Sequence, residues 1–289
     1  MESRGHRLVT ILHEPEPVAT YSTALIIVVG GPQYRVGSHR QFVQLARALA
    51  ARGIVVVRFD YTGMGDSDGP ETDFLDVGPD VAAMVAWTRR RQPDISEIAL
   101  WGLCDGASAA VLFGSDLPGV TGLCLVNPWV RSDTSAANAR VKAYYLVRLR
   151  SLDFWQRLLS GQVNPTSFVG DLVKTATGWA GKRMEFADKD RQPETKSTTP
   201  TESTFVEIMR ARLERFHGRV LIILSSDDLT ASEFRITALE NKRWRKAVSA
   251  AQVMTLEADH TFSTEESKRQ IAHVTENWLA VNDSKGNFY

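Results

Sequence analysis

The sequence is poor in cysteine, in long apolar runs and in net charge. Two cysteines among 289 residues are too few for a disulfide framework, which favours a reducing compartment, and we expect the cytoplasm. No apolar run approaches the roughly 20 residues that span a bilayer. The N-terminus carries charges where an export signal needs an apolar stretch. Basic and acidic residues both number 34, so the chain lacks the positive excess of proteins that coat nucleic acid.

What the sequence does contain is the alternation of an α/β protein. Uninterrupted β-forming runs such as ALIIVVGG (24–31) and IVVVRFD (54–60) suit strands buried on both faces, as in a parallel sheet. Segments with helical periodicity separate these runs, among them one that starts at about Ser38 and ends at Gly53 and one near 232–247. The pattern therefore predicts right-handed crossovers with helices on both faces of the sheet. The predicted strands lie at 7–12, 18–23, 24–31, 54–60, 98–101, 121–128, 219–224 and 252–257.

The alternation stops between residues 133 and 217, which we interpret as a lid inserted into a core formed by residues 1–132 and 218–289. Aromatic side chains of this insertion are expected to wall an apolar substrate pocket, although they could instead hold the lid helices together. They are Tyr144, Tyr145, Phe154, Trp155 and Phe168. The basic run at 140–150 fits a guide for a phosphate of the substrate or, equally, a solvated helix face.

The sharpest local motif is GLCDG at residues 102–106. It matches the nucleophile elbow G-x-S-x-G, in which the nucleophile occupies a strained turn between a strand and a helix and its neighbours must be nearly free of side chains. Cys104 takes the place of the serine, and the N-terminus of the following helix favours the negative charge of a thiolate. A merely structural cysteine is the alternative, which the preceding strand and the small residues at 107–110 disfavour.

A second match to the same pattern, GDSDG at 65–69, is a decoy. It lies well past the end of a strand, and no helix starts directly after it. We interpret residues 60–67 as a structural turn of the form D-x-x-G-x-G-x-S and Ser67 as part of that turn. Cys124 alternates with leucines inside a predicted strand and is assigned to the core.

An acid and a base should follow the nucleophile in chain order. His260 lies in the loop after the last predicted strand, where the base belongs. The loop after the strand at 219–224 offers two carboxylates, and we predict that Asp228 orients the histidine, with Asp227 as the alternative. Either aspartate could instead only cap the helix ahead.

Backbone N–H groups should stabilise the oxyanion of the reaction. One donor is expected from Asp105, the residue after the nucleophile, and the other from the loop at 28–42. Pro32 has no N–H to give, so Gln33 is predicted as the second donor. Arg35 in the same loop could reach a substrate carboxylate or phosphate, or it could be a solvated surface arginine.

Six segments together resemble a known family. They are GGPQYRVGSHRQF, FDYTGMGDSDG, WGLCDGASAA, NPWVRSD, SSDDLTASEF and ADHTFS, and the similarity spans about residues 24–265. The sequence resembles the type-one hydrolase associated with the exosortase A system, a bacterial group with the α/β-hydrolase fold. That resemblance implies a mostly parallel sheet flanked by helices, a helical lid, and a hydrolase of the thioesterase kind with a cysteine nucleophile.

A cysteine nucleophile favours thioesters as substrates, because the attacking and leaving sulfurs are then matched and acylation can proceed. Three hypotheses follow: a thioesterase, an acyltransferase or acyl-condensing enzyme, and a non-catalytic binding protein. Polyhydroxyalkanoate synthases, which use acyl-CoA, carry a similar cysteine elbow and keep acyl transfer open. We expect a small acyl substrate bound to CoA or a carrier protein, no cofactor, no metal and no nucleic acid partner.

Overall fold

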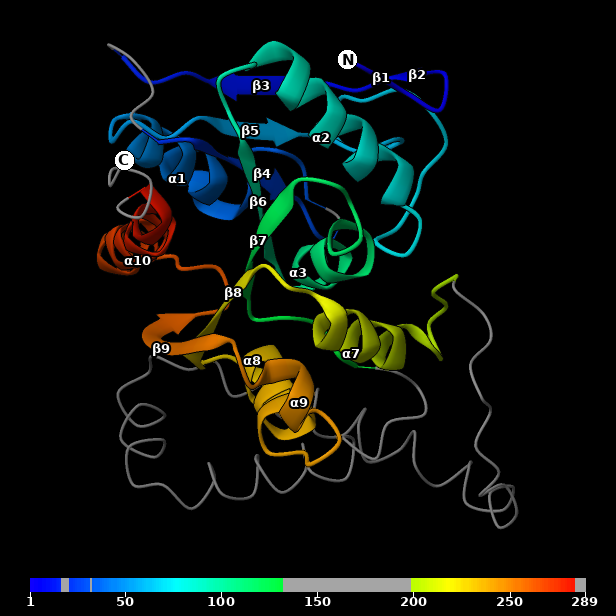
Figure 1. Ribbon diagram of the computed structural model, residues 1–289, viewed down its shortest axis with the longest axis vertical. Coiled ribbons are helices and arrows are strands. Elements are labelled where there is room, and N and C mark those ends of the chain that lie inside the picture. The colour runs from blue at the N-terminus through cyan, green and yellow to red at the C-terminus, as the bar shows by residue number, and fades with distance from the viewer. Residues whose placement is uncertain (17–20, 32, 132–198, 284–289) are drawn as a thin grey trace, which may run out of the picture. The chain divides into compact units, whose positions relative to one another are not determined.

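A seven-stranded sheet forms the centre of the protein (Figure 1). The computed structural model describes residues 1–16, 21–31, 33–131 and 199–283. In spatial order the strands are β3 (Thr10–His13), β5 (Val56–Phe59), β4 (Thr23–Val28), β6 (Glu97–Leu103), β7 (Val120–Val126), β8 (Arg219–Asp227) and β9 (Gln252–Asp259). β3 pairs antiparallel with β5, and the other neighbouring pairs are parallel, so the predicted, mostly parallel sheet is confirmed.

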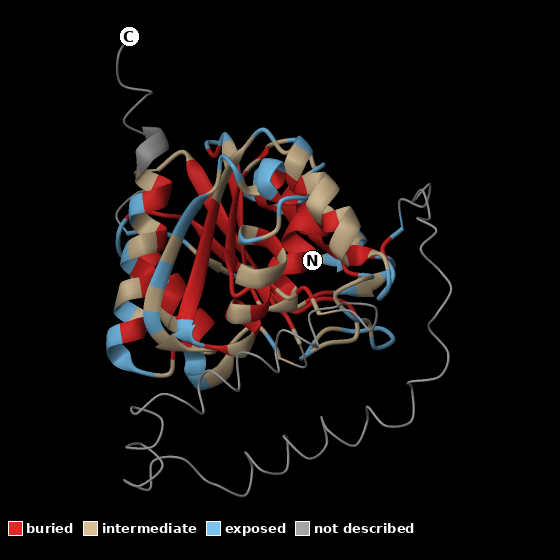
Figure 2. Cartoon of the chain, turned by 90° about the horizontal axis from the view of Figure 1, so that it is seen from below, coloured by how far each residue is buried: buried red, intermediate tan, exposed pale blue. Residues whose placement is uncertain are grey.

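Helices cover both faces of this sheet, and the central strands are buried between them (Figure 2). On one face lie α1 (Gln41–Ala50) and α10 (Glu265–Asp283), which contact each other. On the other face lie α2 (Gly78–Arg91), α3 (Asp105–Ala109), its π-helical continuation η2 (Ala110–Gly114), and α7 (Phe205–Arg215). Every residue of β4 and β5 is buried, including Arg58 of β5.

Three local features differ from the sequence-based expectations. A short hairpin, β1 (Glu2–Ser3) with β2 (His6–Arg7), precedes β3. A 3-10 turn, η1 (Ser38–Arg40), stands where the first helix was expected to begin. The prediction of a single helix near 232–247 is wrong. The chain instead forms three short segments, α8 (Leu229–Phe234), η3 (Arg235–Leu239) and α9 (Arg245–Val248). The break has a local cause: the Asn241 side chain accepts from the Arg243 N–H at 3.0 Å and makes a turn.

Residues 133–198 of the predicted lid lie outside the described residues, as do residues 18–20 of the strand expected at 18–23. The end of the predicted insertion is described and forms α7, whose buried face joins the hydrophobic core of the sheet. In the described ranges, no helix combines the length and the apolar character needed to cross a bilayer.

Asn127, immediately after β7, joins the ends of three neighbouring chain segments. It is fully buried, and its φ of 45° suits asparagine better than most residues. Its Oδ1 accepts from the Ser225 N–H at 2.8 Å, and its Nδ2 donates to Ser225 Oγ at 2.9 Å and to the His260 carbonyl at 3.4 Å. The loop that carries His260 is thereby tied to the carboxyl ends of β7 and β8.

Asn127→Ala should lower the free energy of unfolding by about 1–3 kcal/mol, because the buried Ser225 N–H loses its acceptor. Asn127→Asp is the matched control: it keeps that acceptor and tolerates the positive φ, but loses the amide donor. Urea denaturation of the three proteins measures the effect. Equal stability of the wild type and Asn127→Ala would contradict the role assigned to this residue.

Candidate active site

Cys104 occupies a strained turn between β6 and α3. Its φ and ψ are 59° and −126°, a conformation that costs a non-glycine residue about 1–3 kcal/mol. The turn also needs a glycine two positions later, since a Cβ on Gly106 would lie 2.5 Å from the Val28 carbonyl oxygen. The strand–turn–helix geometry predicted from GLCDG is therefore present, and Cys104 stands at the carboxyl end of the sheet.

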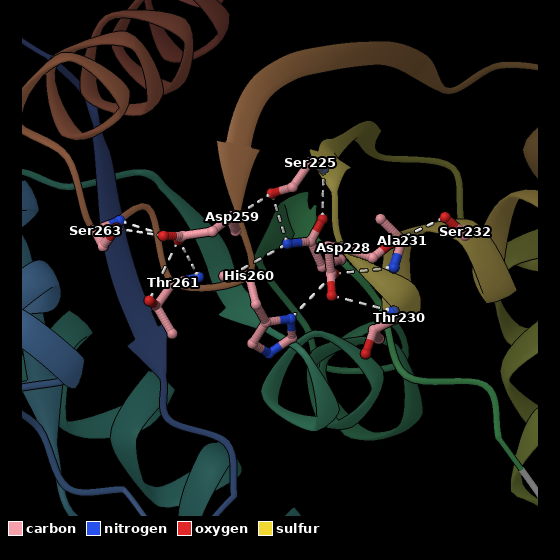
Figure 3. Close-up of polar contacts among 10 residues, drawn as sticks. Ser225, Asp228, Thr230, Ala231, Ser232, Asp259, His260, Thr261 and Ser263 are labelled. Atoms are coloured by element: carbon pink, nitrogen blue, oxygen red, sulfur yellow. Dashed lines mark hydrogen bonds and ion pairs between the residues drawn. The ribbon is translucent and has the colours of Figure 1, made fainter. Parts of the chain in front are cut away.

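His260 and Asp228 meet at the same edge of the sheet. The Asp228 Oδ2 atom lies 3.0 Å from the His260 Nδ1 atom, and Figure 3 shows the imidazole turned toward this carboxylate. The Asp228 carboxylate raises the pKa of His260 most strongly, and the neighbouring Cys104 raises it further. Burial acts in the opposite direction, and the resulting pKa is about 10 instead of 6.5. The geometry thus assembles Cys104, His260 and Asp228 from three separate loops, with the imidazole held in its charged form.

Asp228 has a second task at the start of α8. Its two carboxylate oxygens accept from the N–H groups of Thr230 and Ala231 at 3.2 and 3.0 Å, so it is the N-cap of that helix (Figure 3). Only 6% of Asp228 is exposed, whereas Asp227 is exposed at the end of β8. The sequence analysis treated capping of the helix and orientation of the histidine as alternatives. In the structure, the Asp228 carboxylate caps α8 and also faces His260.

The neighbouring Asp259 orders the loop that carries the histidine. Its carboxylate accepts from the N–H groups of Thr261 and Ser263 at 3.0 and 3.1 Å, and from the Ser263 hydroxyl (Figure 3). Burial opposes charging of Asp259, but these hydrogen bonds outweigh it and lower its pKa. Its own carbonyl accepts from Ser225 Oγ at 3.0 Å. The motif ADHTFS gave no signal for this role beyond the polar residues around the histidine.

The carboxylate of Asp105 lies against the oxyanion loop. It accepts from the Gly31 N–H at 2.7 Å and from the Gly106 N–H at 3.0 Å. It fills the space beside Gly30, where a Cβ would lie 2.0 Å from its Oδ1 atom. Burial raises the pKa of Asp105. The side chain next to Cys104 therefore fixes Gly31, two residues before Gln33.

Arg35 is placed differently from its predicted position in the substrate pocket. Its guanidinium forms ion pairs with Asp60 and with Asp66, the latter at 2.7 Å, and it does not line the cavity described below. These pairs hold the turn that follows β5. In the same turn, the Ser67 hydroxyl donates to the Asp60 carbonyl at 2.7 Å, as its interpretation as a structural residue requires.

A cavity of about 460 Å³ opens above Cys104. Gln33, Asp105 and His260 line it, which is the position that an oxyanion donor or a base must have. Its apolar walls come from five side chains that the sequence analysis did not single out, and two charged side chains also line it. These are Phe42, Phe74, Leu103, Trp129 and Phe205, with Arg131 and Glu202. The aromatics predicted as walls, Tyr144, Tyr145, Phe154, Trp155 and Phe168, lie outside the described residues.

The sequence matches the model of a known protein family. Residues 23–232 match the family model described as serine aminopeptidase, S33. The human protein ABHD12B is 31% identical over 86 residues, and that match covers 30% of this chain but only 23% of ABHD12B.

Solved structures share the fold along nearly the whole chain. An α/β serine hydrolase homologue from Coxiella burnetii has a TM-score of 0.58 at 14% identity, covering 96% of this chain and 95% of that one. Est1E from Butyrivibrio proteoclasticus, solved with ferulic acid, has a TM-score of 0.60 at 13% identity and covers 96% of both chains. The α/β-hydrolase fold implied by the sequence motifs is therefore confirmed.

Asp228→Asn should lower the pKa of His260 from about 10 toward 6.5, because asparagine can still cap α8 but carries no charge. Titration of the imidazole resonances by NMR measures the shift, with Asp227→Asn as the control. Since the folded-state pKa is raised, the pair stabilises the fold fully below pH 6.5 and loses this effect as the pH rises through about 10. Asp228→Asn should therefore cost more stability near pH 6 than above pH 10. A wild-type His260 that titrates at its ordinary value would contradict the prediction.

Proposed function

Because the chain belongs to the α/β-hydrolase family described as serine aminopeptidase, S33, we propose that it is an acyl hydrolase of the thioesterase kind with Cys104 as its nucleophile. One observation carries this proposal: a cysteine occupies the elbow of a hydrolase fold, beside a histidine whose other ring nitrogen faces a carboxylate at 3.0 Å. That arrangement meets the geometric requirement for a nucleophile, a base and an orienting acid.

The acylation step uses each of these groups once. The Cys104 thiolate attacks the carbonyl carbon of a thioester, and the carbonyl oxygen becomes an oxyanion near the N–H groups of Asp105 and Gln33. Collapse of this intermediate breaks the carbon–sulfur bond of the donor. The departing thiolate takes a proton from the His260 imidazolium, which the pKa of about 10 keeps charged at neutral pH. The products are an acyl-Cys104 thioester and a free thiol.

The acyl-enzyme is resolved by a second nucleophile. Water attacks the acyl carbon and gives its proton to His260, the Cys104 thiolate leaves, and a carboxylic acid is released. An alcohol or an amine in place of water makes the same intermediate an acyl donor, and this acyl-transfer activity is the second candidate function. The cysteine elbow favours both candidates over a fold used only for binding, since binding alone does not require the triad.

Further features of the proposal rest on the sequence. We place the chain with the type-one hydrolases associated with the exosortase A system, on the strength of its GGPQYR and WGLCDG segments. The acyl donor is proposed to be bound to CoA or to a carrier protein. A cytoplasmic location is supported by Cys104 and Cys124, both of which are free thiols.

Incubation with a short acyl thioester should add one acyl mass to Cys104, detected by intact-mass spectrometry and peptide mapping. Cys104→Ala should abolish the adduct, since the attacking sulfur is gone. Analysis of the products with and without an added amine or alcohol separates hydrolysis from transfer. An adduct that survives Cys104→Ala, or that maps to Ser67, would falsify the assignment.

Asp105→Ala should slow acylation of Cys104 by a thioester about tenfold or more, because the oxyanion loop loses its attachment to the elbow. Alkylation of Cys104 by iodoacetamide develops no oxyanion and should change much less. Asp105→Asn should be intermediate, since its single amide oxygen cannot replace both carboxylate oxygens. Rapid-quench mass spectrometry follows both reactions. Equal slowing of acylation and alkylation would show that Asp105 acts on the thiolate or on the fold instead.

A further inference from the structure

The chain that follows β7 is fixed directly to the elbow. The Trp129 N–H donates to the Cys104 carbonyl at 3.2 Å, and the Ser108 hydroxyl donates to the Trp129 carbonyl at 2.6 Å. Arg131 comes two residues later, so its Cα lies within about 8 Å of that of Trp129. Both side chains line the cavity that contains Cys104. Arg131 is therefore held at a short and defined distance from the nucleophile.

The guanidinium of Arg131 is oriented by two groups. Its Nε and Nη2 atoms donate to the Glu233 carboxylate at 3.0 and 2.7 Å, and its Cζ atom lies 4.8 Å from the centre of the Trp129 ring. Glu233 is only 2% exposed and stands on α8, the helix that Asp228 caps. The same short helix thus holds the acid that faces His260 and the carboxylate that orients Arg131.

One edge of this guanidinium remains available. Among the described residues, the Nη1 atom of Arg131 has no acceptor within hydrogen-bonding distance, while 38% of the side chain is exposed. An arginine pre-oriented in this way presents N–H donors in the fixed fork that suits a carboxylate or a phosphate. A pair that served only to brace α8 would not need its guanidinium in the wall of the cavity.

The other charged groups of the cavity do not offer the same site. The carboxylate of Asp105 is turned to the backbone N–H groups of Gly31 and Gly106, and His260 is engaged with Asp228. Glu202 is an exposed carboxylate and repels anions. Among the described lining residues, Arg131 is the cation that stands apart from the reacting groups.

We propose that Arg131 binds an anionic group of the substrate, a carboxylate or a phosphate, while the reacting acyl carbon lies at Cys104. This inference rests on the proposed function and narrows its substrates to anionic thioesters. The anion can belong to either end of such a molecule: a carboxylate at the far end of the acyl group, or a phosphate of the thiol carrier. The chemistry recognised by Arg131 is the same in both cases, and the experiment separates them.

The experiment compares three thioesters with the wild type and with Arg131→Gln. They are an uncharged acyl N-acetylcysteamine thioester, the same compound with a terminal carboxylate on its acyl chain, and the coenzyme A thioester of the uncharged acyl chain. For one of the two anionic substrates, the ratio of its kcat/KM to that of the uncharged thioester should fall about tenfold or more in the variant. The substrate whose ratio falls identifies which end Arg131 binds.

Two further variants keep the result interpretable. Arg131→Gln leaves the buried Glu233 carboxylate without its partner, so the double variant with Glu233→Gln is measured beside it. Arg131→Lys should restore part of the ratio, since it keeps the charge but not the fork. Arg210→Gln on α7 is the matched control: Arg210 is paired with Glu207 and Glu214, does not line the cavity, and should leave both ratios unchanged.

Unchanged ratios for both anionic thioesters in Arg131→Gln and in the double variant would overturn the inference.

Failure of all three thioesters to acylate Cys104 would instead contradict the proposed function. The inference is then decided by calorimetry on Cys104→Ala with two non-hydrolysable thioether analogues, one of the carboxylated N-acetylcysteamine compound and one of the coenzyme A compound. The Kd of at least one should rise about tenfold with Arg131→Gln, and no rise with either analogue refutes it.

Discussion

The close contact between the elbow and the end of β4 is the constraint on which the site depends. Gly106 lies so near the Val28 carbonyl, and Gly30 so near the Asp105 carboxylate, that a methyl group at either place has no room. This contact, together with the Asp105 carboxylate that accepts from the Gly31 N–H, puts the oxyanion loop beside Cys104. It also forces Cys104 into its positive φ, since the chain must leave β6 and enter α3 within one residue. The remaining groups of the site are arranged around this fixed point.

Three charged side chains that line the described part of the cavity, His260, Asp105 and Arg131, each have a polar partner. His260 faces Asp228, Asp105 receives backbone N–H groups, and Arg131 holds a buried glutamate. An unpaired charge in this partly buried region would cost several kcal/mol or lose its charge by a pKa shift. The pairing therefore allows an imidazolium, three carboxylates and a guanidinium to lie close together at this edge of the sheet.

The local structures that the sequence predicted are those that depend on neighbouring positions. The elbow at Cys104 and the cap at Asp228 depend on a few neighbouring positions, so their patterns could be recognised directly. Arg35 was misplaced because its partner Asp60 lies 25 residues away, directly after β5. Asn127 was missed for the same reason, since it contacts Ser225, 98 residues further along the chain. No periodicity or spacing rule reports such a contact.

The walls of the cavity also depend on contacts between residues that are distant in the sequence. The five aromatic residues expected to form them lie outside the described residues. The described part is lined by Phe42 of α1, Phe74 after β5 and Phe205 of α7, the last within the predicted insertion. Phe74 and Phe205 meet edge to face, with ring centres 5.3 Å apart, although 131 positions separate them. Their apolar character was visible in the sequence, but their juxtaposition follows only from the way the helices pack over the sheet.

The short helix α8 links two contacts of the site, so a change in this helix affects both. Its first boundary residue, Asp228, governs the proton affinity of the histidine, and Glu233, near its end, governs the direction of the rim arginine. In the function that we propose, a substitution that rotates or shifts this helix therefore alters the reactivity of Cys104 and the preference for an anionic substrate together. Substitutions of Phe74 or Phe205 reshape the proposed acyl pocket without changing α8, and they leave the contacts of His260 and Arg131 in place.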